Sequence, residues 1–174
     1  FDADGISVER LKTAGAIAAV QTTSSEFGAT NQTTTKIHGA TRNPWNLERT
    51  PGGSSGGSAA GVAGGLFALA TASDGGGSIR IPAGFCGLIG LKSTFGRIPR
   101  GPGSILGNAT AVEGTVSRST RDAARYLDVT NGFDPRDPRG LPRVEGYEAG
   151  LGSRADEIRS LRVAVVPDLS CAVV

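Results

Sequence analysis

The 174-residue sequence has few of the residues that usually mark metal or redox chemistry. It contains one histidine, two cysteines, one tryptophan and no methionine. His38, Cys86 and Cys171 lie far apart in unrelated settings, so their spacing does not match a zinc site and we expect no bound metal. Two distant cysteines favour a reducing, cytoplasmic compartment. We interpret the lone histidine, in a loop rich in serine and threonine, as a surface group and not as a base.

The sequence also lacks a large excess of charge of one sign and lacks long apolar runs. The net charge is +2 and the basic residues are spread along the chain, which gives no electrostatic case for nucleic-acid binding. No apolar run approaches 18 residues and no signal-peptide pattern opens the chain, so we expect no membrane association. A hydrophobic content of 38% excludes wholesale disorder, and the length suits one domain.

Glycine, in contrast, is abundant, with 27 residues. The stretch 50–80, TPGGSSGGSAAGVAGGLFALATASDGGGSIR, has two clusters of small residues joined by an apolar run. A flexible linker shares this bias, but a linker has no use for apolar residues such as Val62, Leu66, Phe67 and Leu69. A phosphate-binding loop is a second alternative, and it fails because neither Gly-Lys-Ser/Thr nor GxGxxG is present.

The two clusters suggest a serine nucleophile beside a backbone anion site. Ser54 and Ser78 are each preceded by glycine. Glycine permits positive φ and close backbone approach, so Gly75, Gly76 and Gly77 allow a tight turn whose N–H groups point one way. If Ser78 attacks a carbonyl carbon, the N–H groups from Gly75 to Ser78 are placed to receive the negative oxygen.

The stretch 50–80 resembles the signature of the amidase signature family, in which a GGSSGGS element is followed by a Gly-Gly-Ser-Ile-Arg element. The flanking sequences are also similar to those of the family and follow in the same order. They are SEFG at 25–28, GATRNPWN at 39–46, IPAGFCGLIGLKSTFGRIPRGP at 81–102 and GTVSRSTRDAARYLDV at 114–129. The resemblance covers about residues 6–168.

The resemblance implies a Ser-cisSer-Lys triad that uses no cofactor. Ser78 matches the nucleophile, and Ser54 matches the bridging serine, whose peptide bond is cis in the family. The backbone N–H groups of the implied oxyanion hole belong to Gly75, Gly76, Gly77 and Ser78. The residues expected to support the site are Gly53, Ser55, Asp74 and Arg80, of which the charged pair holds the turn and transfers no proton.

The third member of the triad, a lysine, lies in the family farther upstream than this chain extends. None of the lysines present, Lys12, Lys36 and Lys92, occupies that position. Because the chain also lacks methionine and stops after a strand-like run, we expect residues 1–174 to be part of a single amidase signature domain, truncated at both ends. Without its base, a serine hydroxyl is a weak nucleophile, so we expect the segment alone to be inactive.

The implied function is that of an amidase, which converts a small linear carboxamide to a carboxylate plus ammonia or amine through a seryl acyl-enzyme. One alternative is the A subunit of a tRNA-dependent amidotransferase. Ile81 and Phe95 stand where that branch usually has glutamine and tyrosine, which favours the stand-alone amidase. A catalytically inactive scaffold is a third class, against which both serines argue. Homo-oligomerisation is left open.

The expected fold class is α/β, namely the amidase signature fold, with a mixed β-sheet core covered by helices on both faces, here incomplete. We predict helices over 7–14, 58–67, 120–130 and after Ser78, and strands over 16–20, 69–73, 87–94 and 160–168. The predicted N-caps are Ser7 and Ser119.

The loops carry further expectations. Phe27 and Trp45 are expected to pin the polar stretch 22–51 onto the core, whereas Glu26 and Asn43 are expected to serve as structural hydrogen-bonding groups. A surface loop is predicted over 133–143. Apolar residues in the preceding Pro/Gly loop hint at a non-polar acyl group in the substrate, and they are Ile98, Ile105 and Leu106.

Overall fold

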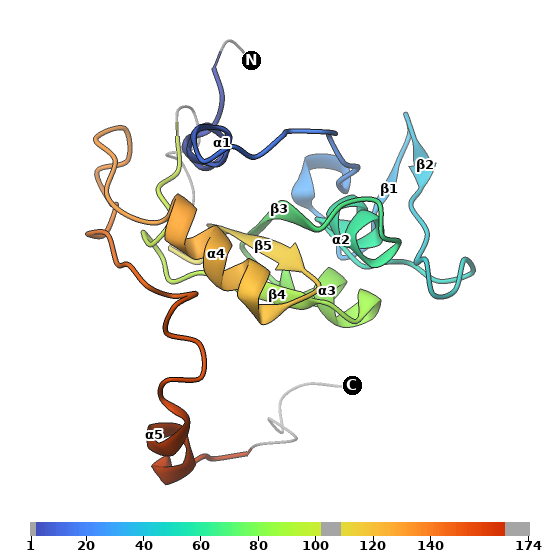
Figure 1. The fold of residues 1–174 in the computed structure, drawn as a ribbon. Coiled ribbons are helices and arrows are strands. Elements are labelled where there is room, and N and C mark those ends of the chain that lie inside the picture. The colour runs from blue at the N-terminus through green and yellow to red at the C-terminus, as the bar shows by residue number, and fades with distance from the viewer. Residues whose placement is uncertain (1–2, 102–108, 166–174) are drawn as a thin grey trace.

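The computed structural model describes residues 3–101 and 109–165 of the chain (Figure 1). Its helices are α1 (Ile6–Thr13), α2 (Gly56–Ala63), α3 (Arg80–Cys86), α4 (Thr120–Thr130) and α5 (Ala155–Ser160), with a short 3-10 turn η1 (Glu26–Gly28). Its strands are β1 (Thr34–Thr35), β2 (Gly39–Ala40), β3 (Leu69–Asp74), β4 (Ile89–Lys92) and β5 (Val112–Ser117). β1 and β2 form a small hairpin, and the other three strands form the central sheet.

The central sheet has the order β3-β5-β4, and β5 runs antiparallel to both neighbours. β5 was not predicted from the sequence, although its Val112 and Val116 alternate with polar residues, as side chains do along a strand. Gly114, between them, faces Ala72 on one side and Lys92 on the other. A Cβ atom at Gly114 would lie 2.0 Å from the Leu91 carbonyl oxygen, so only glycine fits at this position.

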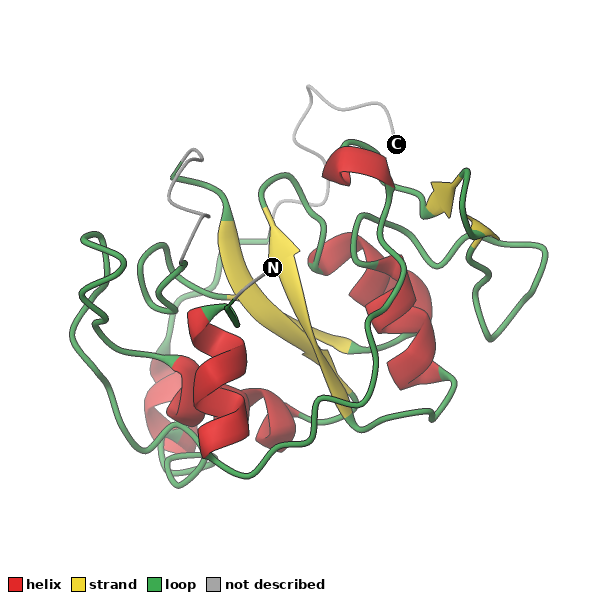
Figure 2. Cartoon of the chain, turned by 90° about the horizontal axis from the view of Figure 1, so that it is seen from above, coloured by secondary structure: helices red, strands yellow, loops and turns green. Residues whose placement is uncertain are grey.

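Helices cover both faces of the sheet, as Figure 2 shows. α2 and α3 pack on one face, and α4 packs on the other, with α1 against α4. The core between the sheet and the first pair of helices contains Val62, Ile79, Ala83 and Val116. This arrangement confirms the expected α/β fold class with helices on both faces of its sheet.

Most predicted elements form within a few residues of their expected bounds. The Ser119 hydroxyl accepts a hydrogen bond from Asp122 N at 3.1 Å, which confirms it as the N-cap of α4. The predicted cap Ser7 is wrong, because Gly5 precedes α1 and Ser7 lies inside the helix. α2 ends at Ala63, before the predicted residue 67, because the chain turns at Gly65 with φ of 78°.

Two predicted strands are wrong. Residues 16–20 are irregular and exposed, with Ile17 90% and Val20 63% accessible. Of the predicted strand 160–168, Ser160 ends α5, 161–165 are irregular, and 166–168 lie outside the described residues. A buried strand needs paired neighbours, and neither run has one within the part of the chain that the structure describes.

The polar stretch 22–51 is held by hydrogen bonds and not by buried aromatic rings. Phe27 is fully exposed and Trp45 is 71% exposed, although the Trp45 indole donates to Cys86 O at 2.8 Å. The structural roles predicted for Asn43 and Glu26 are confirmed. Asn43 Nδ2 donates to the Phe85 carbonyl at 2.9 Å, and a Glu26 carboxylate oxygen accepts from a backbone N–H at 2.8 Å.

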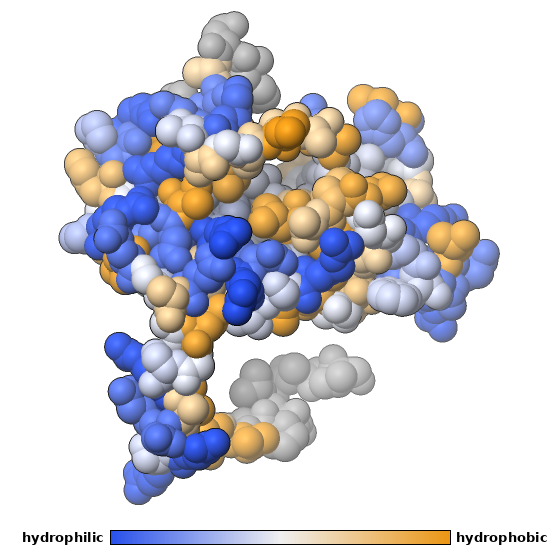
Figure 3. All heavy atoms as spheres, in the orientation of Figure 1, coloured by the Kyte–Doolittle hydropathy of each residue, from blue (hydrophilic) through white to orange (hydrophobic). Residues whose placement is uncertain are grey.

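The surface is mixed in polarity. On the face in Figure 3, hydrophilic residues dominate over α1 and α4, and apolar residues gather toward the middle and right of the view. The predicted surface loop 133–143 is irregular and mostly accessible to solvent, although Asp134 and Asp137 within it are buried. Ile98 is buried at 2% exposure, so its hydrophobicity is explained by packing, whereas Ile105 and Leu106 lie outside the described residues.

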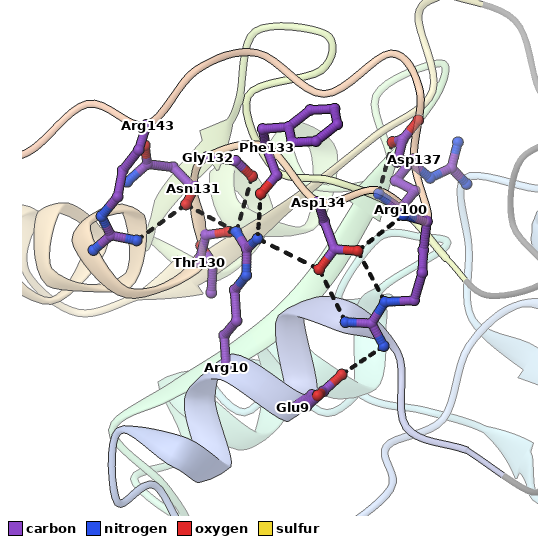
Figure 4. A network of polar contacts seen from close by, with 11 residues as sticks. Glu9, Arg10, Arg100, Thr130, Asn131, Gly132, Phe133, Asp134, Asp137 and Arg143 are labelled. Atoms are coloured by element: carbon purple, nitrogen blue, oxygen red, sulfur yellow. Dashed lines mark hydrogen bonds and ion pairs between the residues drawn. The ribbon is translucent and has the colours of Figure 1, made fainter.

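Arg10 joins the first helix to the end of α4 (Figure 4). Its guanidinium donates to four consecutive carbonyl oxygens at 2.8 to 3.0 Å, those of Thr130, Asn131, Gly132 and Phe133. Carbonyl groups at a helix C-terminus have no intrahelical partner, and a cation there also interacts favourably with the helix dipole. Arg10 therefore ties two segments that the sequence separates by 120 positions.

Replacing Arg10 should destabilise the protein measurably. The substitution Arg10→Met keeps the aliphatic stem but removes the donor to these carbonyl groups, two of which belong to the fully buried residues Thr130 and Asn131. We expect a loss of about 1 to 3 kcal/mol. Urea unfolding of the full-length parent measures the change. Arg125→Met is the matched control, because Arg125 forms an ion pair with Glu148 and its side chain is 69% exposed, so we expect less than about 1 kcal/mol. Equal losses of stability for the two substitutions would contradict the proposed role of Arg10 in joining α1 to the end of α4.

Candidate functional site

The backbone around Ser54 is fixed on several sides. The Gly53–Ser54 peptide bond is cis, in agreement with what the resemblance implied. Ser25 N donates to Ser54 O at 3.1 Å, and the Thr33 hydroxyl donates to Gly52 O at 2.9 Å. A Cβ atom at Gly53 would lie 2.8 Å from Gln32 N, so the segment passes too close to its neighbour for any larger residue. Ser54 itself is buried, with 6% exposed.

The glycine turn that follows β3 is organised by Asp74, which is 1% exposed. One carboxylate oxygen accepts from Gly77 N at 2.8 Å, and the other accepts from Ile79 N at 3.1 Å and Arg80 N at 3.3 Å. The Arg80 guanidinium donates to both oxygens at 3.0 Å. These five bonds fix the residues on both sides of Ser78, namely Gly77 before it and Ile79 and Arg80 after it.

The same contacts set the ionisation of Asp74. Burial would raise the pKa of this carboxyl, but the hydrogen bonds from Arg80 and from three backbone N–H groups outweigh burial and lower the pKa to about 2. The hydrogen bond to Asp74 in turn raises the pKa of Arg80. Asp74 is therefore a carboxylate at neutral pH, which fits a group that holds the turn and does not donate a proton.

The fold brings the two glycine-serine clusters together. Ser55 N donates to Ser78 O at 3.3 Å, and the Ser55 hydroxyl donates to Ser73 O at 3.5 Å. Within residues 3–101 and 109–165, neither the Ser54 nor the Ser78 hydroxyl makes a hydrogen bond. Both hydroxyl groups are therefore available to a substrate or to a group from outside these residues.

The backbone donors of the turn differ from one another. Gly77 N–H is donated to Asp74, so it is already used and departs from the predicted set of anion-binding groups. The N–H groups of Gly75, Gly76 and Ser78 make no hydrogen bond among the described residues. Three donors next to a serine hydroxyl can accommodate the oxygen of a tetrahedral intermediate.

A pocket that the sequence did not predict lies beside Ser55. Its volume is about 280 Å³, and hydroxyl-bearing side chains make up most of its wall. The lining residues are Thr22, Thr23, Ser24, Ser55, Ser58, Thr71, Ala72, Ser73 and Glu113. The sequence signal for Glu113 is a charged residue inside a strand whose other residues are small and uncharged.

Metal-binding clusters and membrane-spanning helices are absent from the described residues. Among them, no three histidine, cysteine, aspartate or glutamate side chains lie close enough to hold a metal ion. None of their helices is long and apolar enough to cross a membrane.

Comparisons with known proteins agree with the geometry. The profile of the family described as Amidase matches residues 2–174. A curated relative, the A subunit of glutamyl-tRNA(Gln) amidotransferase from Oleidesulfovibrio alaskensis, is 46% identical over 163 residues, which are 93% of this chain and 33% of the relative. A solved bacterial aryl acylamidase of the amidase signature enzymes superposes with a TM-score of 0.80 at 36% identity, over 87% of this chain and 31% of that one.

A second solved structure, 6-aminohexanoate cyclic dimer hydrolase, gives a TM-score of 0.78 at 44% identity, over 83% of this chain and 30% of that one. The chain thus spans about a third of the length of the relatives that it matches. The names of these relatives refer to different substrates.

Proposed function

The chain belongs to the Amidase family, and from this premise we propose that its full-length parent hydrolyses a small linear carboxamide through an acyl-enzyme on Ser78. The observation that carries the proposal is the hydrogen bond from Ser55 N to Ser78 O, which seats the segment of Ser54 against the glycine turn. Residues 1–174 form part of one catalytic domain in this proposal, and the base is a lysine outside them.

The proposed steps conserve atoms and charge. Ser78 Oγ attacks the amide carbon while its proton passes through the Ser54 hydroxyl to the lysine. The carbonyl oxygen becomes an oxyanion, which the free N–H groups of Gly75, Gly76 and Ser78 stabilise. The leaving amine takes the proton, and water then hydrolyses the seryl ester to release the carboxylate and restore both serines. No cofactor enters any step.

The A subunit of a tRNA-dependent amidotransferase is the second candidate. The names of the curated relatives favour it, since the relative from Oleidesulfovibrio alaskensis is such a protein. Ile81 favours the hydrolase, because the amidotransferase branch usually has glutamine at this position; the Ile81 side chain packs against Gly77 of the turn. Phe95 supports the same choice on sequence grounds. We infer a cytoplasmic enzyme for either candidate.

Trapping the acyl-enzyme tests the proposal. The full-length parent is incubated with a panel of linear carboxamides, quenched in acid and examined by peptide mass spectrometry. Trypsin would leave Ser54 and Ser78 on one peptide, so the digest uses chymotrypsin, which cleaves after Phe67. We expect an added acyl mass on the fragment that contains Ser78, and none on the fragment that contains Ser54. If glutamine is the only compound that acylates the protein, and if acylation requires partner proteins, the result favours the amidotransferase. Turnover with acylation at a different residue would refute the assignment.

A further inference from the structure

The short turn η1 lies against the Ser54 hydroxyl. A Cβ atom at Gly28 would lie 3.8 Å from Ser54 Oγ, and no other described atom outside the adjoining residues comes within 4 Å of that position. The turn is tied to the same segment by the hydrogen bond from Ser25 N to Ser54 O at 3.1 Å. Because residue 28 has no side chain, the space beside the Ser54 hydroxyl stays open toward η1.

Phe27, which precedes Gly28, combines a strained backbone with an exposed aromatic ring. Its φ is 56°, the one positive value at a non-glycine residue among the described residues. Its side chain is fully exposed, so no packing among these residues compensates the cost of that conformation. The turn nevertheless closes, through hydrogen bonds from Gly28 N to Ser25 O at 3.0 Å and from Ala29 N to Glu26 O at 3.1 Å. The local backbone therefore presents an aromatic ring next to the serine site.

The proposed chemistry places the leaving amine on the Ser54 side of the site. Ser54 stands between Ser78 and the lysine in the proposed proton transfer, so the proton that the leaving nitrogen takes returns through the Ser54 hydroxyl. A proton donor must come within hydrogen-bond reach of the atom that it protonates. The amide nitrogen and its substituent therefore lie toward Ser54 and η1, while the acyl carbon is bonded to Ser78.

We propose that η1 forms the leaving-group side of the substrate site and that the Phe27 ring contacts an apolar substituent on the amide nitrogen. The inference rests on the proposed function and specifies its substrate class, a secondary carboxamide that carries an aryl or alkyl group on nitrogen. The C–N bond breaks as the Ser78 ester forms, and the nitrogen departs with its substituent and the returned proton as a primary amine. Aromatic rings bury a large area and favour edge or offset contact with one another, so an aryl amine suits Phe27 best.

The test uses the full-length parent and three amides that share the acyl group best accepted in the panel above, namely the primary, N-ethyl and N-phenyl amides. All three give the same acyl-enzyme, so a difference in kcat/KM between them arises in binding or acylation. We expect Phe27→Ala to lower kcat/KM for the N-phenyl amide about tenfold and to leave that for the primary amide within about twofold. Phe133→Ala is the matched control, because Phe133 is also an exposed phenylalanine, 57% accessible on a surface loop, and it should leave the ratio of the two rates unchanged.

A second variant separates contact with the substrate from packing. Asparagine tolerates a positive φ, so we expect Phe27→Asn to have a Tm equal to or above that of wild type while its N-phenyl selectivity falls as in Phe27→Ala. A ratio of N-phenyl to primary amide that stays unchanged in both variants would overturn the inference, and a lower Tm would then show that the ring packs against the rest of the parent chain. Turnover by a Ser78→Ala parent would instead overturn the proposed function, whatever the Phe27 variants do.

Discussion

A Ser78→Ala variant of the full-length parent should lose turnover of its carboxamide by about 10⁴-fold to 10⁶-fold, the range expected for removal of a catalytic nucleophile. The alanine methyl group cannot form an ester, so no acyl-enzyme accumulates. The turn itself should survive, because its hydrogen bonds run from Gly77, Ile79 and Arg80 to Asp74 and not through the Ser78 hydroxyl. Binding of substrate should therefore persist in the inactive variant.

Initial rates and the acyl mass on the active-site peptide measure the loss. Ser153→Ala is the matched control, since the Ser153 hydroxyl donates to the nearby Gly150 carbonyl on an exposed segment. A Ser78→Ala parent that keeps more than about a tenth of the activity would mean that the oxygen nucleophile lies elsewhere. A lowered Tm would show that the variant is unfolded. In that case the acyl mass on the wild-type peptide decides whether Ser78 is the nucleophile.

Local patterns in the sequence predicted what local interactions determine. The Ser119 cap and the amphipathic pattern after it fix α4 within its own residues. The glycine run after Asp74 likewise allows a tight turn, which the structure contains, with Gly77 at a φ of 120°. The resemblance added the cis bond before Ser54, which no propensity argument supplies.

Local sequence patterns did not predict the contacts between residues that are far apart in the sequence. The central position of β5 depends on pairing with both β3 and β4, and its alternation extends over only a few residues. Residues 16–20 have the composition of a buried strand, yet composition cannot provide the neighbouring strands that burial requires. Ser7 resembled a cap because its local context allows one, but its hydroxyl instead bonds Glu113, 106 positions away.

The site shows the same division. The sequence placed the anion-binding donors on four consecutive residues, and only the three-dimensional arrangement reveals that Asp74 takes the Gly77 N–H. The Asp74 carboxylate and its backbone donors lie within one short segment, but those donors converge on the carboxylate only when the turn closes. The turn and its acceptor therefore depend on each other.

Because the turn depends on Asp74, we expect a large structural effect from Asp74→Asn, which replaces one carboxylate oxygen by an amide NH₂ group. In Asp74→Asn, the new amide nitrogen faces N–H donors where the carboxylate accepted them, and Arg80 loses its counter-charge. Hydrogen bonds to charged groups contribute about 1.5 to 3 kcal/mol each, and several weaken together, so we expect the free energy of unfolding to fall by about 2 to 4 kcal/mol. Activity should fall about 10²-fold as the donors of the turn lose their alignment.

The pH dependence identifies the carboxylate as the cause. The folded pKa of about 2 lies below the ordinary value of 3.8, so the stabilisation by ionised Asp74 is complete above about pH 4 and is lost as pH falls toward 2. The stability difference between wild type and Asp74→Asn, measured by urea unfolding, should shrink by about 2 kcal/mol over that interval. Asp156→Asn, at a side chain that is 96% exposed, should show neither effect. A difference that stays constant down to pH 2 would mean that the shape of the side chain, and not its charge, holds the turn.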